Sequence, residues 1–161
     1  MVLITGSNMG CREDNLAAAR RLLVCEVGEE KAASGIYESE PWGEMGDGGG
    51  AFLNQVLVLD TALEPLELLD RTQDIEHRLG RTSKGEATGK RIYSSRLIDI
   101  DILYYGGRII ETKRLTIPHP LMSEREFVLV PLTETVPAMK HPVNGKTAEE
   151  MLDELHRRKT K

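Results

Sequence analysis

The chain has 161 residues, of which 40% are hydrophobic and 29% are charged, and this is the composition of an ordinary globular protein. Its length suits one domain spanning residues 1–161, and no apolar run reaches the roughly 18 residues that a membrane-spanning helix needs. The formal net charge of −5 argues against a general nucleic-acid-binding protein.

The N-terminal segment predicts a strand followed by a helix. Residues 1–6 are mostly apolar, and residues 6–10 break this run before Leu16, Ala19 and Leu23 recur at helical spacing. A turn is the simpler interpretation of residues 6–10, and a phosphate-binding helix start is the alternative.

We expect a cytoplasmic protein without a disulfide framework. The segment that begins at Met1 lacks the basic start and the long apolar centre of a secretory signal. Cys11 and Cys25 are the only cysteines, and they do not form a Cys-x-x-Cys pair. The spacing therefore indicates neither a set of disulfide bonds nor a zinc site.

Two further strands are expected on either side of a glycine-rich loop. Residues 31–40 predict the second strand, and residues 43–50 form a loop that we expect to be mobile. Residues 51–60 alternate cleanly and predict the third strand. Phe52, Asn54, Val56 and Val58 share one face of this strand, and Asn54 is the only polar side chain among these four. Core packing is one role for Phe52, and stacking on a flat heterocycle is the other.

A second helix and a basic loop follow. The helix begins at Pro65 and ends at Gly80, with Glu76 at the border of its apolar stripe. The loop over residues 81–96 has a local net charge of +4. A solvated run of charges explains such a loop, and so does a ligand that carries phosphates. The charged residues of the loop are Arg81, Lys84, Glu86, Lys90, Arg91 and Arg96.

The fourth predicted strand carries two carboxylates on one face. Side chains alternate along a strand, so Asp99 and Asp101 point one way while the isoleucines around them point the other way. Their attachment points lie roughly 6.6 Å apart. Mg²⁺, which takes one or two carboxylates together with substrate phosphates, suits this pair. An exposed acidic pair at a sheet edge is the alternative. The isoleucines are Ile98, Ile100 and Ile102.

The remaining elements are short. Residues 105–108 predict a hairpin turn into a strand at residues 109–110, and residues 115–118 and 127–132 are expected to be extended. Thr147 opens a capping box for a terminal helix, which is also why we reject a phosphate-loop interpretation of the neighbouring Gly-Lys-Thr sequence.

The order strand, helix, strand, strand, helix, strand predicts an α+β ferredoxin-like sandwich. Its antiparallel sheet carries helices on one face and leaves the other face free for active-site loops.

Several pieces of this sequence, in this order, resemble the 6-hydroxymethyl-7,8-dihydropterin pyrophosphokinase family, which transfers pyrophosphate from ATP to a pterin hydroxymethyl group and releases AMP. The most specific piece is Arg-x-x-Asp-x-Asp at residues 96–101 followed by Pro-His-Pro at residues 118–120. The other pieces are residues 6–10, 37–43, 52–54, 76–81, 125–127 and 131–132.

The resemblance implies two Mg²⁺ ions at Asp99 and Asp101, with ATP as co-substrate. It implies that Phe52 and Phe127 sandwich the pterin, and that Arg81 and Arg96 support the transition state. The pterin-binding positions it implies are Gly6, Ser39, Trp42, Phe52, Asn54 and Phe127. The ATP-binding positions it implies are Gln73, Glu76, Lys84, Tyr93, Ile102, Arg114, Thr116, His119 and Arg125. No nucleic acid, membrane or obligate protein partner is expected.

The basic loop departs from the family pattern. Ser83 and then Lys84 stand where a second arginine is common, and Tyr93 stands where a tryptophan is common. Lysine does not reproduce the two-pronged contacts of a guanidinium group. The alternative to an enzyme is a non-catalytic ferredoxin-like module that binds a small ligand or single-stranded RNA through its aromatic residues.

Overall fold

The computed structural model describes residues 1–40, 50–80 and 97–161 of the chain. The main sheet has five strands: β1 (Val2–Ser7), β2 (Gly28–Ala33), β3 (Tyr37–Ser39), β4 (Phe52–Thr61) and β5 (Asp99–Tyr104). The helices are α1 (Arg12–Glu26), α2 (Pro65–Arg78), α3 (Glu126–Thr135) and α4 (Ala148–Lys159). A small second sheet pairs β6 (Ile110–Glu111) with β7 (Thr116–Ile117), and a short 3₁₀ helix covers Met122–Glu124.

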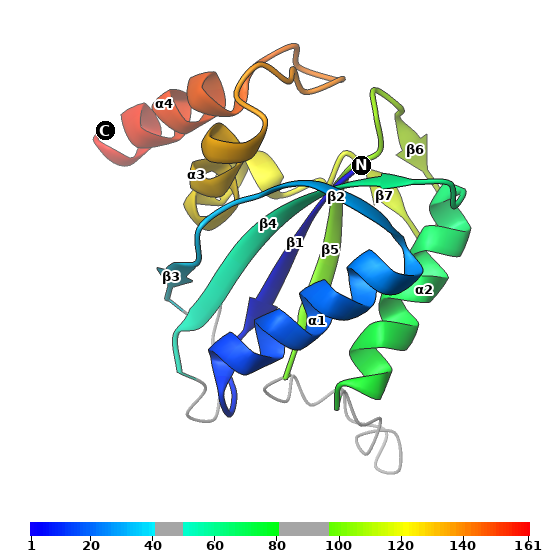
Figure 1. Cartoon of the computed structure of the whole chain (residues 1–161). Coiled ribbons are helices and arrows are strands. Elements are labelled where there is room, and N and C mark those ends of the chain that lie inside the picture. The colour runs from blue at the N-terminus through cyan, green and yellow to red at the C-terminus, as the bar shows by residue number, and fades with distance from the viewer. Residues whose placement is uncertain (41–49, 81–96) are drawn as a thin grey trace.

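The main sheet confirms the predicted ferredoxin-like α+β fold. Its strand order is β2-β4-β1-β5, β3 pairs with β4 beside β2, and every pairing is antiparallel. The two βαβ-type halves interleave, so the chain's first strand lies in the middle of the sheet (Figure 1). The end of β1 and the start of β5 are therefore neighbours at the same end of the strands.

One face of the sheet is covered by α1 and α2, as predicted. The expected residues Leu16, Ala19 and Leu23 are buried on α1, and they pack with the odd-numbered residues of β4 in the larger core cluster. Helix α2 starts with Pro65 at its first turn, and Gly80 follows it with a φ of +114° that favours glycine. Burial of these apolar stripes holds both helices on the sheet.

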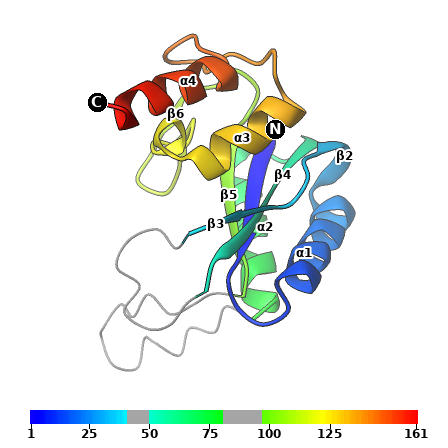
Figure 2. The ribbon, with the colours of Figure 1, turned by 90° about the vertical axis from the view of Figure 1, so that its left-hand side faces the viewer.

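The other face is free only in part, which corrects the expectation that it carries loops alone. Helices α3 and α4 cover its far half, where Val128, Leu129 and Leu132 pack against Val56 and other residues of a second core cluster. In the turned view of Figure 2, α1 lies on one side of the strands while α3 and α4 lie on the other. The half of this face near Gly6 is outside that cluster.

The predicted strand over residues 31–40 is two strands. Between them Ser34 is buried and donates its main-chain N–H to the carbonyl of Val56 at 2.9 Å, while its hydroxyl accepts the N–H of Val56 at 2.9 Å. A side chain thus replaces a main-chain partner in the ladder. The chain bends there and resumes as β3.

Two predictions for the C-terminal half are wrong. Residues 105–108 turn the chain, but Ile110 pairs with Ile117 of β7 rather than with β5, so no hairpin with β5 forms. Residues 127–132 lie inside helix α3, although this segment contains Pro131. Burial of its apolar side chains against the sheet outweighs the weak local preference for extended structure.

The other predictions in this region are confirmed. Residues 116–117 are extended as β7, and Thr147 forms both bonds of a capping box with Glu150 at the start of α4. In the described part of the chain, no helix is long and apolar enough to cross a membrane. Cys11 and Cys25 are both free thiols at the surface.

Candidate functional site

One row of residues crosses the sheet on its open face. Tyr37 of β3 pairs with Asn54 of β4, Asn54 pairs with Gly6 of β1, and Gly6 pairs with Asp99 of β5. Residues directly opposite each other on neighbouring strands present their side chains on the same face. The register therefore brings the predicted pterin residues Gly6 and Asn54 next to the predicted metal ligand Asp99.

The glycine at the centre of this row makes room. A Cβ atom on Gly6 would lie 3.1 Å from Oδ1 of Asn54 and 3.6 Å from Cδ1 of Phe52. Nδ2 of Asn54 donates to the carbonyl of Tyr37 at 3.2 Å and to the hydroxyl of Ser39 at 2.8 Å. Because these bonds fix the amide, Oδ1 is the atom that Asn54 presents above Gly6. An amide oxygen there accepts hydrogen bonds from a ligand.

The acidic pair faces the same side, as the alternation of β5 predicts. Ile98, Ile100 and Ile102 are buried in the core under the helices, whereas Asp99 is half-buried and Asp101 is exposed. Within the described residues, no group of three or more His, Cys, Asp or Glu side chains is arranged to hold a metal ion. Two carboxylates alone suit Mg²⁺, which completes its octahedron with phosphate oxygens and water.

The outer edge of β5 is lined by helix α2. Glu76 is buried, and its Oε2 accepts the main-chain N–H of Ile100 at 3.1 Å. Main-chain groups two residues apart point to the same edge of a strand. The N–H and carbonyl of Ile102 therefore also point outward, while its side chain is in the core. Any contact of Ile102 with a nucleotide is made by its main chain.

His119 lies close to Asp101, and Arg125 lies close to His119. The main-chain N–H of His119 donates to the carbonyl of Leu103 at 3.1 Å, which places the imidazole beside β5. Burial lowers the pKa of His119 from its ordinary value, the Asp101 carboxylate raises it, and Arg125 lowers it further. Because Nδ1 accepts the N–H of Leu121 at 3.2 Å, the neutral ring carries its proton on Nε2.

Phe127 comes to this side of the sheet on the first turn of α3. The guanidinium carbon of Arg125 lies 5.7 Å from the centre of the Phe127 ring. Both residues are half-buried, and Phe127 packs against the second core cluster. Phe52 and Phe127 are thus on the same side of the sheet, as a pterin sandwich requires.

Three predicted nucleotide residues are at the surface. Gln73 on α2 and Thr116 on β7 are both exposed. Arg114, in the turn between β6 and β7, forms an ion pair with Asp70 of α2. Most of the loop over residues 43–50, which we expect to be mobile, lies outside the described residues. The remaining predicted site residues also lie outside them, and these are Trp42, Arg81, Lys84, Tyr93 and Arg96.

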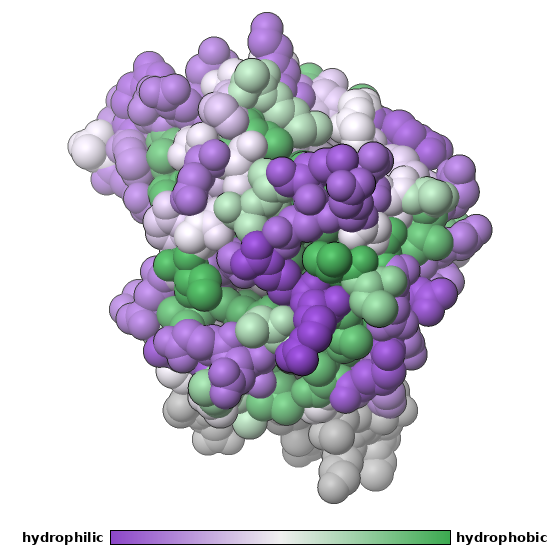
Figure 3. Space-filling model, in the orientation of Figure 1, coloured by the Kyte–Doolittle hydropathy of each residue, from purple (hydrophilic) through white to green (hydrophobic). Residues whose placement is uncertain are grey.

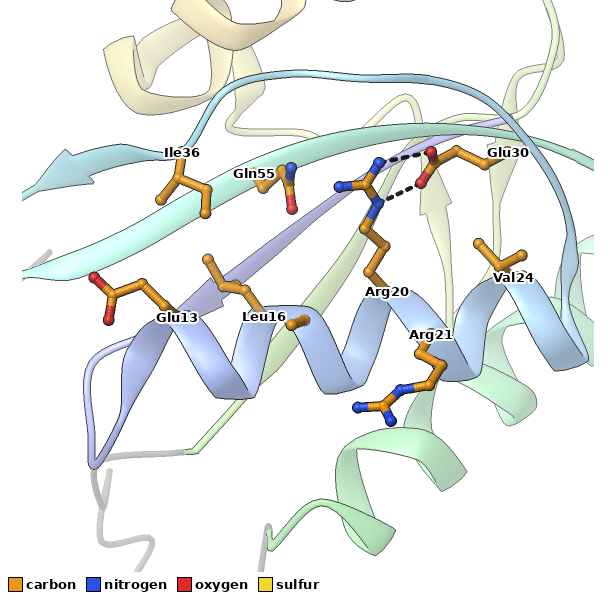
Figure 4. A pocket seen from close by; sticks show the side chains of 9 residues that line it. Glu13, Leu16, Arg20, Arg21, Val24, Glu30, Ile36 and Gln55 are labelled. Atoms are coloured by element: carbon orange, nitrogen blue, oxygen red, sulfur yellow. Dashed lines mark hydrogen bonds and ion pairs between the residues drawn. The ribbon is translucent and has the colours of Figure 1, made fainter.

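A separate hollow of about 430 Å³ lies on the helix face, between α1 and the strands (Figure 4). Figure 3 shows the molecule in the same orientation as Figure 1, and hydrophilic and hydrophobic residues are mixed over this surface. Arg20 lines the hollow but is held by both oxygens of Glu30, at 2.6 and 2.7 Å. Since Leu16 and Gln55 also line it, the sheet separates this hollow from Asp99 and Asp101, and it is not part of the acidic site.

Comparison with known proteins decides the family. The model of the 7,8-dihydro-6-hydroxymethylpterin-pyrophosphokinase (HPPK) family matches residues 2–137. The chain belongs to this family. It is therefore a pyrophosphokinase of folate biosynthesis, and the relationship does not favour a non-catalytic module that binds a ligand or RNA.

Curated relatives support this assignment over most of the chain. A 2-amino-4-hydroxy-6-hydroxymethyldihydropteridine pyrophosphokinase of Porphyromonas gingivalis is 40% identical over 141 residues, which cover 87% of this chain and 92% of the relative. A relative of the same description from Bacillus subtilis is 43% identical over 131 residues, which cover 80% of this chain and 73% of the relative.

Solved structures share the fold at low identity. Wild-type HPPK-DHPS of Plasmodium falciparum matches with a TM-score of 0.72 and 16% identity over 98% of this chain. A triple mutant of the same protein matches with a TM-score of 0.75 and 17% identity over 99% of this chain. This chain spans 44% of each of those longer chains, and the likeness concerns the fold.

Sequence reasoning missed three residues near the site. Tyr37 and Glu134 share a hydrogen bond across 97 residues of sequence, which no local pattern reveals. Asn8 lies two residues beyond Gly6, and its side-chain nitrogen and oxygen are buried without a hydrogen-bond partner among the described residues. Its position after an alternating strand was the available signal, because residues two apart share a face.

Proposed function

We propose that this pyrophosphokinase transfers the pyrophosphoryl group of ATP to the hydroxymethyl group of 6-hydroxymethyl-7,8-dihydropterin and releases AMP. The observation that carries the proposal is the row from Asn54 through Gly6 to Asp99, which joins a slot for a flat ring to a carboxylate pair on one face of the sheet.

The pterin side of the proposal rests on shape and hydrogen bonding. The missing side chain of Gly6 lets Asn54 and Phe52 approach β1 closely, and Asn54 presents its amide oxygen there with an orientation fixed by Tyr37 and Ser39. Phe52 supplies an aromatic wall from the sheet, and Phe127 supplies one from α3. Fixed aromatic walls and one oriented amide hold a flat heterocycle with little loss of conformational freedom on binding.

The nucleotide side rests on the edge of β5. Main-chain groups of Ile102 point outward there, next to the buried Glu76. His119 lies near Asp101 and Arg125 lies near His119, so that a phosphate chain on this edge would meet positive charge and hydrogen-bond donors. Arg81, Arg96 and Lys84 complete the proposed set of phosphate contacts. Holding both substrates in line and balancing the phosphate charge supply most of the rate acceleration in such transfers.

Two Mg²⁺ ions at Asp99 and Asp101 are the proposed metal complement. Bound there, they would neutralise phosphate charge and lower the pKa of the attacking hydroxyl group. The two carboxylates would hold the ions, and the isoleucines on the opposite face of β5 anchor that strand in the core.

The test is a product analysis. Purified protein is mixed with ATP, Mg²⁺ and 6-hydroxymethyl-7,8-dihydropterin, and the nucleotides are separated by liquid chromatography. We expect AMP to form in proportion to pterin diphosphate. Formation of ADP, or no turnover with Mg²⁺ present, would refute the proposal. Asp60→Asn is a matched control for substitutions of Asp99 and Asp101, because Asp60 is also an exposed strand carboxylate. It lies at the end of β4 that is far from Asn54.

A further inference from the structure

The carboxylate of Glu134 links helix α3 to strand β3 and to the residues just before that strand. Oε1 of Glu134 accepts the main-chain N–H of Gly35 at 2.9 Å, and Oε2 accepts the hydroxyl of Tyr37 at 2.5 Å. Donation from these two groups lowers the pKa of Glu134, so the carboxylate stays ionised at neutral pH. A charged acceptor with two donors holds the β3 segment in place from the last turn of α3.

This attachment continues into the proposed pterin slot. The carbonyl of Tyr37 accepts one hydrogen bond from Nδ2 of Asn54, and the hydroxyl of Ser39 accepts another. A chain of hydrogen bonds therefore runs from Glu134 through Tyr37 to Asn54, whose Oδ1 lies above Gly6. The position of that oxygen depends on where β3 is held.

Among the described residues, few other contacts hold β3 on this face. The strand has three residues and pairs only with β4 in the main sheet. Its middle residue, Glu38, points to the opposite face and meets Arg12 of α1 in an exposed ion pair at 3.4 Å. On the face of the site, Glu134 is the contact that holds the strand at both Gly35 and Tyr37.

We propose that Glu134 and Tyr37 are positioning residues for the pterin: they hold β3 so that Asn54 and Ser39 are pre-oriented before the ring binds. This inference rests on the proposed function, because it assigns the slot above Gly6 to the pterin. Helix α3 serves both sides of that slot, because it carries Phe127 at its start and Glu134, which holds β3, at its end. Neither residue touches the reacting atoms.

The experiment compares Tyr37→Phe, Glu134→Ala and Glu134→Gln by steady-state kinetics with each substrate varied in turn. We expect the KM for the pterin to rise about threefold to tenfold in Tyr37→Phe and Glu134→Ala, because the hydrogen bonds lost are exposed to solvent and each contributes modestly. The KM for ATP and kcat should stay within about twofold of wild type. Glu134→Gln should recover part of the loss, because its amide oxygen still accepts the N–H of Gly35.

A binding measurement separates this inference from the proposed function. The fluorescent probe 6-hydroxymethylpterin is titrated into each protein with Mg²⁺ and α,β-methylene-ATP present, and no turnover is needed. Weaker binding by Tyr37→Phe and Glu134→Ala supports the positioning role. Failure of the wild-type protein to bind the probe would count against both the proposed function and the inference.

Glu38→Gln is the matched control. It also removes a carboxylate that links β3 to a helix, but from the opposite face, so its pterin KM should equal that of wild type. A rise of the pterin KM in Glu38→Gln as large as in Glu134→Ala would overturn the inference, because general loosening of β3 would then explain both. Unchanged pterin KM and probe affinity in Tyr37→Phe and Glu134→Ala would overturn it as well.

Discussion

Replacing Gly6 by alanine tests the proposed pterin slot most directly. The φ angle of Gly6 is not in the left-handed region, so alanine fits the backbone there. The added methyl group would lie 3.1 Å from Oδ1 of Asn54, and relief of this contact requires a shift of a few tenths of an ångström. The bonds of Nδ2 to Ser39 at 2.8 Å and to Tyr37 at 3.2 Å resist that shift.

Two opposing effects keep the stability change of Gly6→Ala small. Loss of glycine's freedom in the unfolded chain stabilises the variant by about 0.4–1 kcal/mol. Crowding against Asn54 costs a similar amount, at the low end of the ~1–3 kcal/mol for an added methyl group in a packed site. We therefore expect the free energy of unfolding to change by less than about 1 kcal/mol.

The effect on binding should be larger. The methyl group occupies the floor of the slot, so the pterin loses contact with the amide oxygen, and the pterin KM should rise at least about tenfold, which is about 1.4 kcal/mol. The assay is AMP release at varied pterin concentration, with urea unfolding of the same protein. Gly107→Ala is the control, because a Cβ atom there meets nothing within 4 Å. A wild-type pterin KM in Gly6→Ala would refute the placement of the ring above Gly6.

Three further predictions concern other parts of the molecule. Asp99→Asn and Asp101→Asn should each slow AMP release by at least about 10³-fold with unchanged circular dichroism, and wild-type turnover in either variant would exclude the metal assignment. Gly28→Ala should lower the free energy of unfolding by about 3 kcal/mol or more, because its Cβ atom would lie 2.1 Å from the carbonyl oxygen of Asp60. Urea unfolding measures this change, and a loss below about 1 kcal/mol would contradict the packing at this position. Burial lowers the pKa of His141 below its ordinary 6.5, so the unfolded state binds more protons and stability is lost as pH falls below about 6.5. His141→Gln should show a smaller loss of stability between pH 7.5 and 5.5, and an equal loss in both proteins would refute this linkage.

Local sequence patterns predicted the elements that depend on near neighbours. Alternation in β5 was enough to bury Ile100 and to put Asp99 and Asp101 on the opposite face, because period-two alternation is set by the strand itself. The capping box at Thr147 is equally local. The segment around Pro131 was assigned wrongly because its helix depends on packing against the distant sheet, which its own residues do not encode.

The candidate site was predictable residue by residue but not as an arrangement. Asn54 stood out as a polar residue on an apolar strand face, and Asp99 as a carboxylate in a strand. The link from Tyr37 to Glu134 was not predictable, because it joins residues 97 positions apart and each is ordinary in its own segment.

The sequence by itself determined which side chains share a strand face and where α2 and α4 begin, since these properties follow from backbone geometry over a few residues. The tertiary structure alone decided that α3 and α4 cover one half of the main-sheet face opposite α1 and α2 and do not pack on the half near Gly6. It also decided the register that aligns Tyr37, Asn54, Gly6 and Asp99 across four strands. Register of this kind depends on pairing between distant segments, and a shift of one residue would turn Asn54 to the other face.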